Sequence, residues 1–176
     1  MRKIILLVAV IFCVAAQSNA QFGVVKMVGK NANNYSLGYG AYLKGAYPLP
    51  KGASATLELG FNDFALQDGG EGDGTVVVPL KIGYRYTINH SGTGFYVEPQ
   101  VGYNLVGVTS INVNGYTENY KFHGVVFAAN AGYIIPIKSC PIDLNLKYET
   151  VSHDGGSENY VSLGLSLYLR FKRRDY

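Results

Sequence analysis

Hydrophobic residues alternate strictly with polar or small residues in seven separate stretches of this 176-residue chain. Alternation with a period of two puts successive side chains on opposite faces of an extended backbone, which is the pattern of a half-buried β-strand. No sustained 3.6-residue apolar pattern, typical of an amphipathic helix, accompanies it. The stretches are 35–47, 53–64, 76–86, 95–105, 125–135, 142–149 and 160–171, and a weaker stretch at 22–30 makes eight. We therefore predict an all-β chain with eight strands.

The connections between these stretches alternate in character. Three are short and turn-like, at 48–52, 89–93 and 136–141. Four are polar and Gly-rich, at 31–34, 67–74, 107–123 and 153–158. Short turns at one end and longer loops at the other predict an eight-stranded antiparallel up-and-down transmembrane β-barrel, since strands of about 9–11 residues cross a bilayer when tilted.

Charge is distributed unevenly between the two faces of the predicted strands. The apolar face carries one charged residue, Asp63, at a strand end. The opposite face is rich in glycine and carries nine charged residues, predicted to form a network in the lumen: Lys44, Glu58, Lys81, Arg85, Glu98, Asp143, Lys147, Glu149 and Arg170. The interior of an eight-stranded barrel is just wide enough to be filled by side chains, so the large apolar set would overfill it. The apolar face is therefore predicted to face lipid. The alternative is a soluble lipocalin-like carrier with the apolar face inside.

The first twenty residues have the features of a secretory signal peptide. Arg2 and Lys3 precede an apolar run at 4–16, and Ser18-Asn19-Ala20 supplies small residues before a cut ahead of Gln21. The run is too short for a helical membrane span, which needs about 20 residues. We thus expect a signal peptide at 1–20 and an outer-membrane barrel domain at 21–176. Cys140 would then be the sole cysteine, with no defined role.

The last predicted strand contains a recognisable pattern. It reads Ser162-x-Gly164-x-x-Leu167-x-Leu169, followed by Arg170 and Phe171. With the signal peptide and the eight-strand pattern, it resembles the small eight-stranded outer-membrane β-barrel proteins of Gram-negative bacteria, the OmpA/OmpX-like group, over the whole mature chain. The resemblance implies that Ser162, Gly164, Leu167, Leu169 and Phe171 form the C-terminal signal read by the barrel-assembly machinery. It also implies a monomer in outer-membrane lipid. Residues 172–176 follow Phe171, whereas such barrels often end at that aromatic residue.

The expected role is structural or interactive: membrane integrity, adhesion, or contact with an extracellular ligand through the loops. A lumen filled with charged side chains excludes an open pore for large solutes, and a narrow ion leak stays open. The enzyme alternative is lipid A modification, for which His123 and His153 lie near Ser152, Asp154 and Ser157 in the sequence. We expect these to be ordinary residues of solvent-exposed loops and expect no catalytic site. The acidic stretch at 68–74 lacks the ligand spacing of an EF-hand calcium loop, and we expect no metal or cofactor. A net charge of +3 gives no indication of a nucleic-acid partner.

Overall fold

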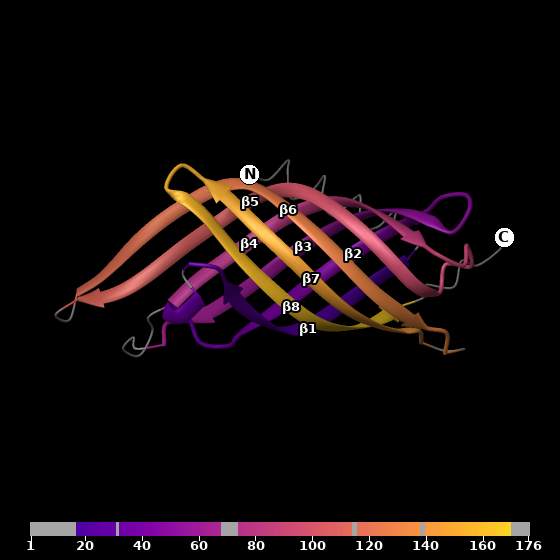
Figure 1. Ribbon diagram of the computed structural model, residues 1–176, viewed down its shortest axis with the longest axis horizontal. Coiled ribbons are helices and arrows are strands. Elements are labelled where there is room, and N and C mark those ends of the chain that lie inside the picture. The colour runs from indigo at the N-terminus through magenta and orange to yellow at the C-terminus, as the bar shows by residue number, and fades with distance from the viewer. Residues whose placement is uncertain (1–16, 31, 68–73, 114–115, 138–139, 170–176) are drawn as a thin grey trace.

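The computed structural model describes residues 17–30, 32–67, 74–113, 116–137 and 140–169. Eight antiparallel strands close into one barrel in chain order, and β8 pairs with β1 (Figure 1). The elements are β1 (Gln17–Val28), η1 (Ala32–Asn34), β2 (Gly38–Pro48), β3 (Ala53–Ala65), β4 (Gly74–Thr87), β5 (Gly94–Val113), β6 (Tyr116–Ile135), β7 (Ile142–His153) and β8 (Gly156–Leu169). The predicted fold class is confirmed. No helix in the described part of the chain is long and apolar enough to cross a membrane.

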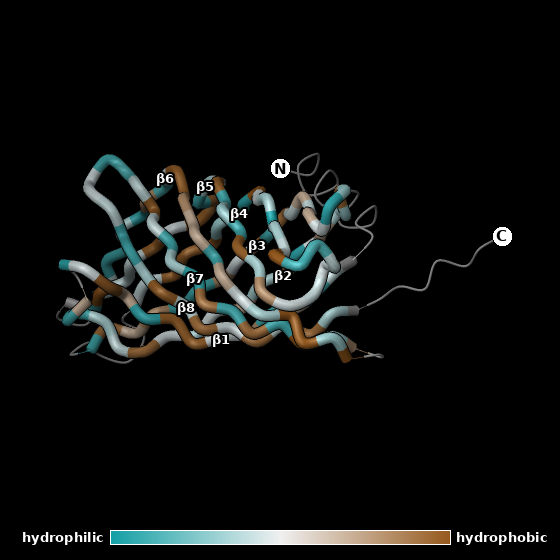
Figure 2. Tube along the Cα trace, turned by 45° about the vertical axis from the view of Figure 1, so that its right-hand side comes forward, coloured by the Kyte–Doolittle hydropathy of each residue, from teal (hydrophilic) through white to brown (hydrophobic). Residues whose placement is uncertain are grey.

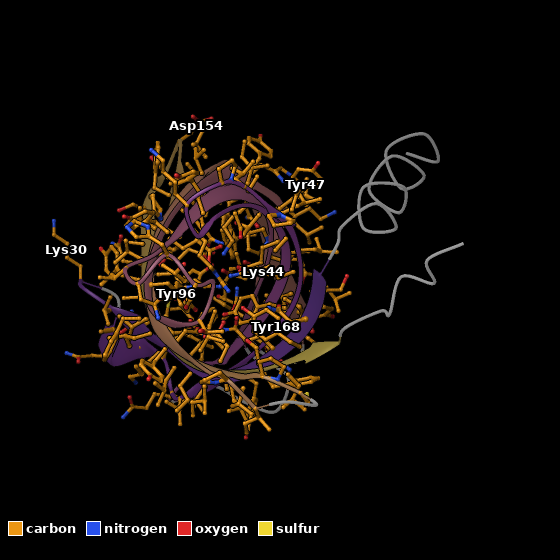
Figure 3. All side chains as sticks on the ribbon, turned by 90° about the vertical axis from the view of Figure 1, so that its right-hand side faces the viewer. Lys30, Lys44, Tyr47, Tyr96, Asp154 and Tyr168 are labelled. Atoms are coloured by element: carbon orange, nitrogen blue, oxygen red, sulfur yellow. The ribbon has the colours of Figure 1, made fainter. Side chains whose placement is uncertain are left out.

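The two faces of the barrel wall differ as the alternation indicates. Hydropathy changes from residue to residue along the strands (Figure 2). Viewed along the barrel, Lys44, Tyr96 and Tyr168 lie inside the ring of strands and Tyr47 lies outside it (Figure 3). Large apolar side chains are exposed on the outside, including these: Phe22, Leu43, Phe61, Ile82, Tyr84, Phe95, Phe127, Leu146, Leu163 and Leu165. A soluble carrier needs the opposite arrangement, so the lipocalin-like alternative is wrong.

Two of the predicted loops are wrong. Most of the segment 107–123 is strand, because β5 and β6 pair from Gly107 opposite Phe122 up to Val113 opposite Tyr116. These residues are β-branched or aromatic often enough to hold a ladder, but on β6 every position from Tyr116 to Lys121 is exposed, so strict apolar–polar alternation is lost. The predicted loop at 153–158 is likewise a tight hairpin, in which β7 ends at His153 and β8 begins at Gly156.

The start of the barrel also differs from the prediction. The weak strand at 22–30 is replaced by β1, which begins at Gln17 and ends at Val28. In β2, the first residue is Gly38 rather than Tyr35, and Tyr35 makes an isolated bridge with Leu66 at the rim. The loop end of the barrel is the end that holds Tyr35 and the β5–β6 and β7–β8 connections. The turn end holds the β2–β3, β4–β5 and β6–β7 connections.

Glycine residues on the inner face allow neighbouring backbone and side-chain atoms to approach closely inside the barrel. A Cβ added to Gly102 would overlap the backbone carbonyl of Leu80. A Cβ added to Gly164 would overlap the side-chain amide of Gln21 and lie 3.0 Å from Asn145 Oδ1. Both positions face the lumen, so no larger residue fits without shifting backbone or a buried amide.

Candidate functional site

A layer of charged side chains fills the middle of the barrel. Eight of the nine residues predicted for the lumen lie in it, and Arg170 lies outside the described residues. Each exposes at most 4% of its surface: Lys44, Glu58, Lys81, Arg85, Glu98, Asp143, Lys147 and Glu149. Four bases thus face four acids, and the layer is neutral as a whole.

Glu58 on β3 is the centre of this layer. Its Oε1 lies 2.9 Å from Lys81 Nζ and 2.5 Å from Lys147 Nζ, and its Oε2 lies 2.8 Å from Lys44 Nζ. Gln100 Nε2 donates a further hydrogen bond to Oε2 at 3.2 Å. One carboxylate therefore contacts lysines from β2, β4 and β7, which joins opposite sides of the barrel wall.

A second branch runs toward the turn end. Arg85 donates from Nε to Glu98 Oε2 at 2.9 Å, and its Nη1 lies 3.5 Å from Asp143 Oδ2. The guanidinium carbon also lies 4.0 Å from the centre of the Tyr96 ring, a cation–π distance. Tyr96 donates its hydroxyl to Asp143 Oδ1 at 2.8 Å, so each carboxylate in this branch has both a cation and a neutral donor. Such satisfaction is what makes buried charge tolerable.

On the loop-end side, Glu149 closes the layer. It forms an ion pair with Lys81 and accepts a hydrogen bond from the Tyr160 hydroxyl. Tyr160 also belongs to an apolar cluster in the interior, on the loop-end side of the charged layer, which the strand pattern did not predict. Its members are Val25, Met27, Tyr35, Phe64, Val77, Val126, Val151 and Tyr160. At this height in the barrel the strands carry hydrophobic residues on both faces, as at Val125 and Val126. Alternation of apolar and polar residues therefore cannot show which of them face the interior. The lumen is therefore filled by charge at its middle and by apolar side chains toward the loop end.

The residues predicted to form the assembly signal lie on both faces of β8. Ser162 is buried in the interior at 2% exposure, Gly164 also faces inward, and Leu167 is exposed on the outside at 48%. Leu169 is the last residue of β8, and Phe171 lies outside the described residues. Their role in assembly stays a prediction.

A cleft opens at the loop end between the long β5–β6 hairpin and the β7–β8 turn. The hairpin reaches beyond the neighbouring strands (Figure 1), and β6 pairs with β7 only as far as Val125 opposite Ser152. The cleft has a volume of about 670 Å³, and the residues lining it include Tyr120, Lys121, Phe122, His123, His153, Asp154 and Glu158. Aromatic rings, both signs of charge and two imidazoles therefore meet in one solvent-facing space.

Local contacts fix the aromatic side of this cleft. The Phe122 and His153 rings lie 5.0 Å apart, and His153 Nδ1 accepts a hydrogen bond from the Gly155 N–H at 3.2 Å. Tyr120 donates to Glu118 Oε2 at 2.6 Å, and this carboxylate raises the pKa of the Tyr120 hydroxyl. His153 thus contacts Phe122 and Gly155, and no hydrogen bond joins His123 or His153 to a serine among the described residues. Those residues also contain no cluster of three or more side chains able to hold a metal ion.

An eight-stranded barrel with an apolar exterior and a filled, charged interior defines a class of protein. The chain has the fold of the small eight-stranded outer-membrane β-barrels. No family model matches the sequence, and no curated protein matches it.

Solved structures of similar fold are those of proteins with little sequence identity to this chain. Ail, the attachment invasion locus protein of Yersinia pestis, has a TM-score of 0.63 and 16% identity, covering 88% of this chain and 99% of Ail. The N-terminal β-barrel domain of Pseudomonas aeruginosa OprF has a TM-score of 0.59 and 13% identity over 88% and 98%. Neisserial surface protein A has a TM-score of 0.58 and 8% identity over 88% and 96%. At these identities the likeness concerns the fold.

Proposed function

We propose that the protein is an integral outer-membrane barrel that carries out surface contact through its loop end and does not form an open pore for large solutes. The observation that carries the membrane location is the exposed apolar band around a closed, charge-filled interior. In water, such a band would leave many large apolar side chains without a partner. In a bilayer it lies in its preferred solvent, while the closed hydrogen-bonded wall leaves no strand edge in lipid.

Neighbouring residues on β8 test this location directly. Leu163 is 60% exposed and Ser162 is 2% exposed, although they are adjacent in the chain. In a Cys140→Ser background, a spin label at Leu163→Cys should collide readily with oxygen dissolved in the lipid. A label at Ser162→Cys should collide with oxygen much less often, because that position faces the packed lumen. Frequent collision of the Leu163→Cys label with a water-soluble quencher would contradict the membrane location, because that label would then face water.

The surface-contact role is supported by the cleft at the loop end. It is the part of the described barrel where exposed aromatic and charged side chains surround an open space, and tyrosine is enriched among the residues that dominate binding interfaces. Ail is described as an attachment invasion locus protein, and one structure shows it with the heparin analogue sucrose octasulfate. These descriptions support an adhesive role for a protein of this fold.

Adhesion measurements can assign the contact to this cleft. Cells displaying the protein should bind cultured epithelial cells, and Tyr120→Ala should weaken that binding about tenfold, the loss expected for one central aromatic anchor. Tyr47→Ala is the matched control, because Tyr47 is exposed to a similar extent, 58% against 57%, but lies at the turn end. Equal loss in both variants, or no loss in either, would show that the cleft does not make the contact. Sucrose octasulfate added as a competitor shows whether a sulfated glycan is the ligand.

A further inference from the structure

Strand β1 continues upstream of the cut predicted before Gln21. Four residues of β1, 17–20, are paired with β2, from Gln17 opposite Ala46 to Ala20 opposite Leu43. Three of them also pair with β8, from Ser18 opposite Leu169 to Ala20 opposite Leu167. This segment therefore closes the turn-end part of the barrel wall between its first neighbour and its last strand.

The interior side of this segment is packed as well. Asn19 is 5% exposed and lies directly opposite Lys44, a member of the charge layer that is 2% exposed. Removal of residues 17–20 would take away the strand segment beside Lys44 and open the barrel wall at that point. It would also leave eight residues of β1, Gln21 to Val28, which is less than the roughly 9–11 that a tilted strand needs to cross a bilayer.

Residues 17–20 also provide backbone hydrogen-bond partners for both neighbouring strands. Without 17–20, the stretches 43–46 of β2 and 167–169 of β8 lose their ladder partners on the facing edges. Unpaired peptide groups are costly in hydrocarbon, and an open sheet edge is not tolerated there. A barrel cut before Gln21 would therefore have a gap in its wall, whereas a barrel that keeps 17–20 is closed.

We infer that export processing retains residues 17–20, and that the leader is removed by hydrolysis of the Ala16–Gln17 bond. A signal peptidase would add water across this amide, leaving a carboxylate on Ala16 and an amine on Gln17. In the sequence, Ala16 provides the small residue directly before the cut, and Val14 provides a compact residue two positions earlier, after a basic and then apolar stretch. This inference rests on the proposed export to the outer membrane.

The intact mass of the protein extracted from the membrane tests the site. Both possible cuts leave an N-terminal glutamine, so mass is a more reliable readout than stepwise sequencing, which a cyclised glutamine blocks. We expect the mass of residues 17–176. A heat-modifiable, folded barrel with the mass of residues 21–176 would overturn the inference while leaving the outer-membrane proposal intact. An uncleaved chain, or one recovered from the soluble periplasm, would overturn both.

Two matched substitutions locate the cut independently. A bulky residue directly before the scissile bond blocks a site that needs a small one. Ala16→Phe should accumulate precursor, whereas Ala20→Phe should be processed like the wild type, because Ala20 would be an ordinary position on the outer wall. The reverse result would overturn the inference. Deletion of 17–20 from a chain still carrying residues 1–16 should abolish the heat-modifiable form.

Discussion

Replacement of Glu58 by Gln should lower the free energy of unfolding by about 3–5 kcal/mol, the cost of removing one partner from a buried ion pair. Glu58 accepts from three buried lysines. Two of them keep another carboxylate after the change: Lys44 has Glu98, and Lys81 has Glu149. Lys147 has Glu58 as its ion-pair partner among the described residues, so Glu58→Gln leaves its charge buried without a direct ion pair. Equilibrium unfolding in urea, followed by heat-modifiable gel mobility in phospholipid vesicles, measures the loss.

A double-mutant cycle separates this cause from simple loss of a hydrogen bond. Adding Lys147→Met to Glu58→Gln should recover part of the stability, because the stranded charge is then replaced by an apolar side chain lying near the Tyr42 ring. Glu118→Gln is the matched control, since Glu118 is exposed on the β5–β6 hairpin and should change stability little. Two results would show that the charge layer is not a dry, coupled unit. The first is a Glu58→Gln variant as stable as the wild type. The second is a double variant that loses more unfolding free energy than the two single variants lose together.

From the sequence we could predict on which side of the barrel wall these charged residues lie, but not which of them form pairs. Alternation alone assigns Glu58 and Lys147 to one face, because the period of a strand is two. It cannot say that they meet, since they are 89 residues apart and approach across the barrel from β3 and β7. That contact depends on the closure and register of the whole barrel, which are set by many hairpins together.

The loop end was predicted least well, and for a physical reason. The alternation pattern depends on a contrast between a buried and an exposed face, and on the outer part of the β5–β6 hairpin β6 is exposed at every position from Tyr116 to Lys121. Tyr116 is 79% exposed and Tyr120 is 57% exposed, although both lie in a strand. His123 and His153 were noted from the sequence, but their meeting in one cleft with Phe122 required the hairpin that the pattern did not show. The available signal was the density of Tyr, Thr and Val at 108–122, which favours strand.

Replacement of Leu163 by Lys should destabilise the barrel by about 2–4 kcal/mol, the cost of a lysine on the lipid face near the middle of a bilayer. Leu163 lies in the middle of β8, with its side chain 60% exposed on the outer face. In water the same change would be close to neutral, because an exposed lysine is well solvated. The size of the effect, measured by urea unfolding in phospholipid vesicles, therefore reports which solvent surrounds the exterior.

Tyr116→Lys is the matched control for this change. Tyr116 is also a large, exposed side chain on a strand, but it lies at the tip of the β5–β6 hairpin, beyond the neighbouring strands. If the exterior band is in lipid and the hairpin tip is in water, Leu163→Lys is strongly destabilising and Tyr116→Lys is nearly neutral. Similar small effects at both sites would mean that water surrounds the whole exterior. Similar large effects would place the hairpin in the bilayer and remove the cleft from the cell surface. The difference between these two lysines thus tests the two parts of the proposed function, a barrel wall in lipid and a contact site in water.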